Sequence, residues 1–301
     1  MEPVVDEVLD LQDGRRLAYC EWGSREGAPV VFINGSPAGS RLWIPDERVT
    51  EDRAVRLVTF DRPGTGRSDP KAPRRLSDVP LDLAALADAL EIERFPVIGY
   101  STGGVYAAAC AALLGPRVTG AAIVSTRHLA LYNVGERPES YDELDAESRA
   151  VYDLAQQDPL AAAEHCKQQD AEWVEQLRER PESIWDGPAE ERAPEGDRWF
   201  WRDAERTASF YSSIREALRQ GIEGYKWESL DVFLPWGFRL SEISVPVTIW
   251  YGVQDARFQG RGLELEKWVE ERIPGCTVVT WDDAGHMGLV KYWDTVLDSI
   301  L

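Results

Sequence analysis

The chain has 301 residues, of which 44% are hydrophobic and 29% are charged, a balance typical of a globular protein with one large or two ordinary domains. It carries 33 basic and 53 acidic side chains, which gives a formal net charge of −20. A surface this acidic repels phosphate backbones and anionic lipid headgroups, so we expect no nucleic-acid partner and no membrane partner.

The N-terminus and the cysteines favour a cytoplasmic location. No basic stretch leads into an apolar one near residue 1, and no apolar run approaches the roughly 18 residues of a membrane-spanning helix. We therefore expect no signal peptide and no membrane span. The four cysteines are far apart and include no Cys-x-x-Cys pair, which argues for reduced thiols rather than a disulfide scaffold.

Short apolar runs alternate with helical patterns over the first 126 residues. The expected strands lie at 17–22, 30–33, 56–60, 96–100 and 121–125, and the expected helices at 81–90 and 103–114. Continuous apolar strands separated by helices are typical of a parallel sheet that is covered on both faces. This part of the sequence therefore predicts an α/β fold.

The pattern changes over residues 127–240 and then returns. This middle stretch has helical patterns, few β-branched residues and six of the twelve tryptophans. After it, we expect strands at 247–251 and 276–281 and helices at 263–272 and 289–301. We therefore predict an α/β core formed by residues 1–126 and 241–301, with a helical cap inserted at 127–240.

Residues 99–103, Gly-Tyr-Ser-Thr-Gly, match the pattern Gly-x-Ser-x-Gly between an expected strand and an expected helix. A serine on such a sharp turn takes strained backbone angles, and the glycines leave room for the turn. The start of the helix adds free N–H groups that can stabilise an oxyanion. We therefore expect Ser101 to be a nucleophile.

A nucleophilic serine needs a base, and the base needs a carboxylate that fixes its tautomer. His286 follows the last expected strand, so it should lie at the same edge of the sheet as Ser101. Asp255 follows the strand at 247–251 and should reach the same edge. Of the other two histidines, His128 leads into the insertion and His165 lies in a helical pattern within it, so we expect structural or surface roles for both. The predicted triad is Ser101, Asp255 and His286.

These motifs together resemble the α/β-hydrolase superfamily, in the branch with a helical cap. The resemblance covers roughly residues 15–126 and 241–301. It rests on Asn34-Gly35-Ser36-Pro37, on the run from Asp61 to Ser68, on the Ser101 turn, on Gly252 to Asp255, and on Gly285-His286. It implies a mostly parallel sheet flanked by helices, with the cap above the carboxyl edge. Serine at position 101 argues against the haloalkane dehalogenases and epoxide hydrolases of this superfamily, and the 34–39 loop keeps only the outline of that of prolyl aminopeptidases.

The resemblance also implies an oxyanion hole. Its donors would be the N–H groups of Thr102, directly after the nucleophile, and of Ser36, in the loop after the third strand. This sequence departs from the family pattern at Asn34, where a histidine is usual. Because the donor is a backbone group, the change affects how the loop is braced rather than the donor itself.

The expected substrate site is an apolar pocket between cap and core. Trp201, Tyr211 and Trp236 of the cap are candidate lining residues, because charged residues of the insertion lie mostly at helix-surface spacing. Asn34 and Tyr100, which adjoin the oxyanion loop and the nucleophile, are further candidates. Such a pocket would favour a bulky, uncharged small molecule.

The predicted reaction is hydrolysis of an ester, thioester or lactone through an acyl-serine intermediate. No phosphate loop, dinucleotide fingerprint or metal-ligand cluster is present in the sequence, so we expect no cofactor and no metal. An acyltransferase or an intramolecular cyclase would use the same triad. A third alternative is a member of the fold that binds a ligand or closes a ring without hydrolysis.

Overall fold

The computed structural model describes residues 2–37, 39–185, 187–255 and 262–301. These residues form one eight-stranded sheet with the strand order β1-β2-β4-β3-β5-β6-β7-β8. The first two strands, β1 (Val5–Asp10) and β2 (Arg16–Gly23), are antiparallel to their neighbours, and all other pairs are parallel. The parallel strands are β3 (Ala28–Ile33), β4 (Val55–Phe60), β5 (Phe95–Tyr100), β6 (Val118–Val124), β7 (Val247–Gly252) and β8 (Thr277–Trp281). The predicted α/β fold class is confirmed.

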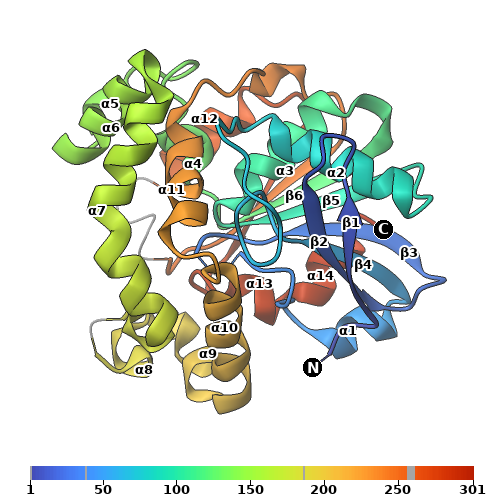
Figure 1. The fold of residues 1–301 in the computed structure, drawn as a ribbon. Helices are drawn as coiled ribbons and strands as arrows, with labels where there is room; N and C mark the ends of the chain where they lie inside the picture. The colour runs from blue at the N-terminus through green and yellow to red at the C-terminus, as the bar shows by residue number, and fades with distance from the viewer. Residues whose placement is uncertain (1, 38, 186, 256–261) are drawn as a thin grey trace.

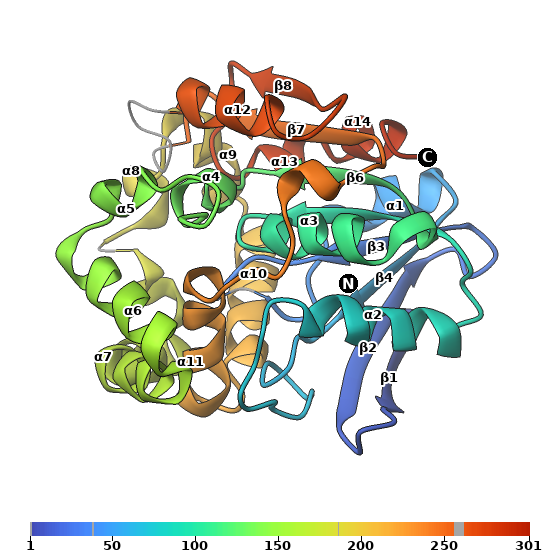
Figure 2. The ribbon, with the colours of Figure 1, turned by 90° about the horizontal axis from the view of Figure 1, so that it is seen from above.

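Alternate residues of the central strands enter different hydrophobic cores, because successive side chains of a strand point to opposite faces. Val31 and Ile33 of β3 pack in the core that includes α2 (Asp78–Ala89) and α3 (Gly103–Leu113). Val30 and Phe32 pack in the core that includes α14 (Trp293–Asp298). Helices thus cover both faces of the sheet (Figure 2).

An additional strand and a divided helix are among the differences from the sequence-based expectation. The strand β1 was not expected; it is an exposed edge strand rich in Asp and Glu, which suits an edge but hides the apolar signal. The single helix expected at 289–301 forms two short helices, α13 (Gly288–Lys291) and α14, separated at Tyr292.

Between β6 and β7 the described residues form helices and no strand. In Figure 1 the helices α6, α7 and α11 lie beside the sheet rather than on its faces. The α-helices of this stretch are α4 (His128–Leu131), α5 (Ser140–Glu143), α6 (Ala146–Gln157), α7 (Pro159–Glu179), α8 (Ala189–Arg192), α9 (Arg198–Arg202), α10 (Ala204–Ala217) and α11 (Ile222–Leu230). The division of the chain into a core and a cap domain stays a prediction.

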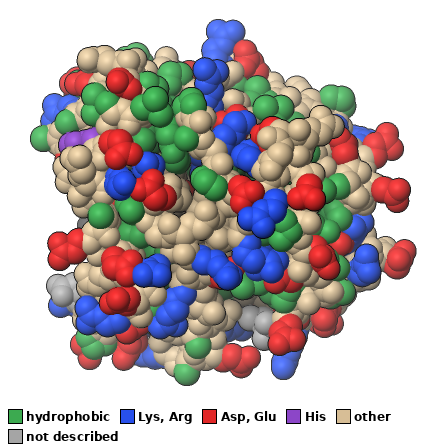
Figure 3. All heavy atoms as spheres, viewed as in Figure 1, with side chains coloured by type: hydrophobic (Ala, Val, Ile, Leu, Met, Phe, Trp, Pro, Cys, Tyr) green, Lys and Arg blue, Asp and Glu red, His purple; other side chains and the backbone are tan. Residues whose placement is uncertain are grey.

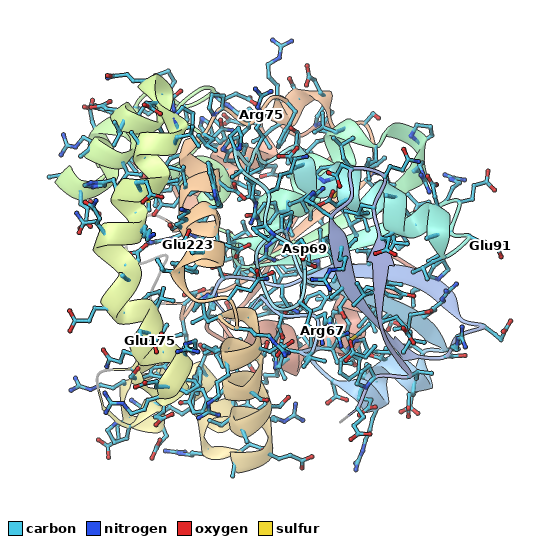
Figure 4. The ribbon with its side chains drawn as sticks, in the orientation of Figure 1. Arg67, Asp69, Arg75, Glu91, Glu175 and Glu223 are labelled. Atoms are coloured by element: carbon cyan, nitrogen blue, oxygen red, sulfur yellow. The ribbon has the colours of Figure 1, made fainter. Side chains whose placement is uncertain are left out.

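The helices α6, α7 and α11 share a small core of their own. Val151, Cys166, Trp227 and neighbouring apolar residues are buried in it. At its edge, Glu223 of α11, labelled in Figure 4, pairs with Lys226 on the same helix and with Lys167 of α7. Apolar burial thus holds α11 against α7, and charged contacts at the rim add to it.

The remaining short elements complete the chain. Helix α1 (Glu47–Asp52) joins β3 to β4, and α12 (Gly262–Glu270) joins β7 to β8.

Acidic and basic side chains are interspersed on the face drawn in Figure 3. Within the described parts of the chain, no helix is both long and apolar enough to cross a membrane.

Candidate active site

Ser101 occupies the tight turn between β5 and α3. Its φ of +53° lies in the left-handed region, which is unfavourable for a residue with a side chain. A Cβ at Gly99 would be 2.4 Å from the carbonyl oxygen of Gly103, and a Cβ at Gly103 would be 2.1 Å from that of Ile33. Both glycines of the motif are therefore required by close backbone contacts.

Neighbouring groups hold this strained turn in place. The N–H of Ser101 donates to the carbonyl oxygen of Val124 at 2.8 Å, and Thr126 Oγ1 donates to that of Ser101 at 2.6 Å. Thr126 was not singled out from the sequence, because its contact depends on β6 lying next to β5.

Asp255 and His286 meet at the carboxyl edge of the sheet. Asp255 follows β7 and is 2% exposed, and His286 follows β8. The Nδ1 atom of His286 lies 2.6 Å from Oδ2 of Asp255. A hydrogen bond from Nδ1–H to a buried carboxylate fixes the imidazole tautomer and leaves Nε2 to accept a proton.

Tyr100 connects the base to the serine turn. Its ring lies 5.0 Å from the His286 ring, centroid to centroid, and its hydroxyl donates to the carbonyl oxygen of His286 at 3.1 Å. Tyr100 directly precedes Ser101, so this packing places the base beside the nucleophile turn. The structure therefore gives Tyr100 a supporting position under His286, whereas the sequence suggested a substrate contact.

The loop after β3 passes directly over Ser101. A Cβ at Gly35 would lie 2.8 Å from Cβ of Ser101, so only glycine fits there. Arg62 donates to the carbonyl oxygens of Asn34 and Gly35, at 2.5 and 3.1 Å. In a trans peptide the C=O and the following N–H point in opposite directions, so the Ser36 N–H points away from Arg62.

Asn34 braces this loop from within. Its Nδ2 atom donates to the carbonyl oxygens of Ser40 and Trp43, each at 2.9 Å. The amide thus ties the loop to the chain that follows it. The sequence proposed Asn34 as a substrate contact, but both hydrogen bonds from its Nδ2 atom are internal to the loop.

A buried ionic network lies behind the same loop. Arg62 donates two hydrogen bonds to Glu228 of α11, at 2.6 and 2.7 Å, and Arg74 pairs with both Glu228 and Asp231. Burial opposes ionisation of Glu228, but Arg62 and Arg74 outweigh it and lower its pKa to about 2. Glu228 therefore stays charged and holds α11 against the oxyanion loop.

Backbone packing reinforces this link. A Cβ at Gly224 of α11 would lie 1.7 Å from the carbonyl oxygen of Gly64, so the helix contacts the 61–68 turn directly. The sequence singled out this turn only through the family resemblance and indicated no partner for it in the insertion.

A cavity of about 250 Å³ contains Ser101 together with both predicted oxyanion donors, Ser36 and Thr102. Its other lining residues are Arg127, His128, Tyr132, Tyr225, Glu228, Ser229, Val232 and Phe233. The wall is therefore largely polar, and the apolar character expected from the sequence is a wrong prediction for this cavity. His128, for which a structural or surface role was expected, lies on this wall.

None of the three cap aromatics proposed from the sequence lines this cavity. Trp201 and Tyr211 border a different cavity, with Arg180 and Pro188. Trp236 packs against Phe238 and donates from Nε1 to the carbonyl oxygen of Val232 at 3.1 Å. Helical spacing indicated that these aromatics face inward, but it did not indicate which partner they would face.

Among the described residues, no group of three or more His, Cys, Asp or Glu side chains is arranged to hold a metal ion. The chemistry that this site offers is that of a serine on a strained turn beside a histidine–carboxylate pair. With both predicted oxyanion donors on the same cavity, this arrangement is typical of enzymes that transfer an acyl group to serine.

Comparison with known proteins identifies the family of the chain. The profile of the family described as alpha/beta hydrolase fold matches residues 28–291, so the chain belongs to that family. An esterase from Exiguobacterium antarcticum superposes with a TM-score of 0.65 at 18% identity, covering 98% of each chain. An enol-lactonase from Burkholderia xenovorans LB400 gives 0.63 at 21% identity, also over 98% of each chain.

Relatives of higher identity match shorter stretches. A non-heme chloroperoxidase from Streptomyces lividans is 37% identical over 115 residues, 38% of this chain and 42% of the relative. A proline iminopeptidase from Xylella fastidiosa is 36% identical over 112 residues, 36% of each chain. The chain thus spans well under half the length of these relatives.

Proposed function

We propose that this protein is a serine hydrolase that cleaves an ester, a thioester or a lactone through an acyl-serine intermediate. The observation that carries the proposal is the 2.6 Å contact between His286 and a buried Asp255, next to a serine held at positive φ. The relatives named above are enzymes, and the structural neighbours include an esterase and a lactonase, which supports the same reaction class.

In the proposed mechanism, His286 Nε2 takes the proton of the Ser101 hydroxyl as Oγ attacks the substrate carbonyl. The N–H groups of Ser36 and Thr102 stabilise the oxyanion of the tetrahedral intermediate. The intermediate collapses to the acyl-serine, and the leaving alcohol or thiol receives the proton from His286. Water, activated by the same imidazole, then releases the acid and restores Ser101.

The cavity argues for a substrate with polar groups near the scissile bond. At about 250 Å³ it lies below the usual range of ligand pockets, and Arg127, His128 and Ser229 line it. We therefore propose a compact substrate that makes hydrogen bonds, in place of the bulky apolar one that the sequence favoured.

A fluorophosphonate probe tests the nucleophile. Intact-mass measurement should show one adduct on the wild type and none on Ser101→Ala, because the probe needs an activated serine. Equal labelling of Ser101→Ala would exclude Ser101, and an unlabelled, folded wild type would favour the non-hydrolytic alternative.

A panel of esters tests the substrate class. Short aryl esters with hydroxyl or amide substituents should be hydrolysed with a higher kcat/KM than long-chain esters, because polar groups line the cavity. A preference for long-chain esters would contradict the proposed substrate class. Product analysis in the presence of added alcohols separates hydrolysis from acyl transfer.

A further inference from the structure

A short segment of the insertion rests on the loop that carries His286. This segment, Glu195–Asp197, precedes α9. The Oδ1 atom of Asp197 accepts hydrogen bonds from the N–H groups of Gly285, at 2.9 Å, and Met287, at 3.1 Å. These are the residues on either side of His286. One carboxylate oxygen therefore binds the backbone both before and after the proposed base.

The contact is too close for side chains at the neighbouring positions. A Cβ at Gly285 would lie 2.5 Å from Oδ2 of Asp197, and a Cβ at Gly196 would lie 2.8 Å from the carbonyl oxygen of Asp283. Glycine at positions 196 and 285 allows the two backbone segments to pack directly against each other. The His286 loop therefore has little freedom to shift relative to Asp197.

Gln254 ties the loop of the catalytic acid to the same place. Its Oε1 accepts from the N–H of Gly196 at 2.8 Å, and its Nε2 donates to the carbonyl oxygen of Asp282 at 3.0 Å. Gln254 directly precedes Asp255. Its two hydrogen bonds therefore join the segment of the catalytic acid to the segment that contains Asp197 and to the loop that carries His286.

The Asp197 carboxylate is buried, at 2% exposure, and its acceptor bonds to backbone N–H groups favour its charged form. Burial, together with the nearby charge of Asp255, raises its pKa to about 6 despite these bonds. A charged acceptor makes stronger hydrogen bonds than a neutral one. At neutral pH the charged carboxylate therefore holds the loop, but its burial lowers the free energy of unfolding through desolvation.

We propose that the Asp197 carboxylate is a positioning residue, through which the inserted helices hold the His286 backbone in register with Asp255 and Ser101. This inference rests on the proposed function, because it assigns His286 the role of base. Asp197 does not touch the reacting atoms. It acts by fixing the backbone N–H groups of Gly285 and Met287, the residues on either side of His286.

Three variants test the proposal: Asp197→Ala, Asp197→Asn and the control Asp158→Ala. Asp158 also accepts two backbone N–H groups through one oxygen, from Leu160 and Ala161, but it is exposed and caps the N-terminus of α7. The control removes the same kind of bonds from the same insertion. It therefore reports what general loosening of the insertion does.

The first measurement is the rate of fluorophosphonate labelling of Ser101, with kcat and KM for an aryl ester. For Asp197→Ala we expect labelling and kcat to fall roughly 10- to 100-fold with little change in KM, because misplacing a catalytic group slows chemistry more than binding. Asp158→Ala should label at the wild-type rate even where its melting temperature falls. Wild-type labelling of folded Asp197→Ala would overturn the proposal, as would equal slowing of the control.

The second measurement is the proton NMR resonance of His286 Nδ1–H, which reports the hydrogen bond to Asp255. It should shift or broaden in both Asp197 variants and stay unchanged in Asp158→Ala; an unchanged resonance in the Asp197 variants would overturn the proposal.

If Asp197→Ala does not fold, Asp197→Asn decides, because it keeps the side-chain volume and loses the charge. Labelling of Asp197→Asn at the wild-type rate would then overturn the role of the carboxylate. An unlabelled wild type would instead refute the proposed function.

Discussion

At the scale of single residues, Asp255 fixes which nitrogen of His286 is protonated, so its charge matters more than its volume. We expect Asp255→Asn to lower kcat about 10⁴-fold with the fold intact, the loss that the equivalent change causes in a serine protease. Ester hydrolysis and circular dichroism test this. The control Asp298→Asn removes an exposed carboxylate bonded to Arg53 and should keep full activity; near-normal turnover of Asp255→Asn would mean that another group is the acid.

The residues that carry the proposed chemistry were those that sequence reasoning located best. Ser101, Asp255 and His286 each follow a strand, and strand ends meet at one edge of a parallel sheet, so their proximity followed from the pattern alone. Asp197 could not be found in this way. It lies 88 residues from Gly285 in the sequence, in a stretch with no motif, and only the folded contact shows its role.

At the scale of elements, α11 contacts the oxyanion loop through Glu228. Changing Glu228→Gln would leave Arg62 without its buried carboxylate partner, whereas Arg74 keeps Asp231. Breaking one partner of a buried ion pair typically costs about 3–5 kcal/mol, so the free energy of unfolding should fall by that order. Because Arg62 also holds the carbonyl groups of Asn34 and Gly35, Ser101 labelling should slow as well.

The control for this change lies on the same helix. Glu223 pairs with Lys167 and Lys226, but its side chain is 56% exposed. Exposed pairs contribute about 0–1 kcal/mol, so Glu223→Gln should change urea unfolding little and leave labelling unchanged. If both variants behave alike, Glu228 does not brace the loop.

Elements were predictable where burial imposed a pattern. All six residues of β5 are buried, which explains its continuous apolar run, whereas the exposed edge strand β1 gave no such signal. Of the tryptophans of the insertion, Trp201, Trp227 and Trp236 are buried and Trp173 is exposed, and Trp236 packs with Phe238 rather than at Ser101. Periodicity fixes the buried face of a helix and not the element that covers it.

At the scale of the whole molecule, the chain has a net charge of −20, and the face drawn in Figure 3 carries side chains of both signs. Many surface carboxylates are paired with arginine, such as Asp6 with Arg67, which Figure 4 labels near the 61–68 turn. Buried carboxylates behave differently, because water is absent. Their effect on stability depends on whether a cation compensates them, as for Glu228, or only backbone N–H groups do, as for Asp197.

Asp197 should therefore make the stability of the protein depend on pH in a specific window. Burial raises its pKa from 3.8 to about 6, so between these values the native state binds more protons than the unfolded state. The contribution of Asp197 is then fully present below pH 4 and is lost as pH rises through 6. A shift of this size corresponds to about 3 kcal/mol.

Urea unfolding at pH 4, 5, 6 and 7 tests this linkage. The difference in unfolding free energy between Asp197→Asn and wild type should rise in favour of the variant by up to about 3 kcal/mol across the series, because the amide carries no charge. If the unfolding free energies of Asp197→Asn and wild type change with pH in parallel, the carboxylate is solvated. Above pH 6, Asp197→Asn is compared with wild type in both unfolding free energy and kcat. If the variant is more stable and has the lower kcat, the buried charge lowers the stability of the fold while it positions His286.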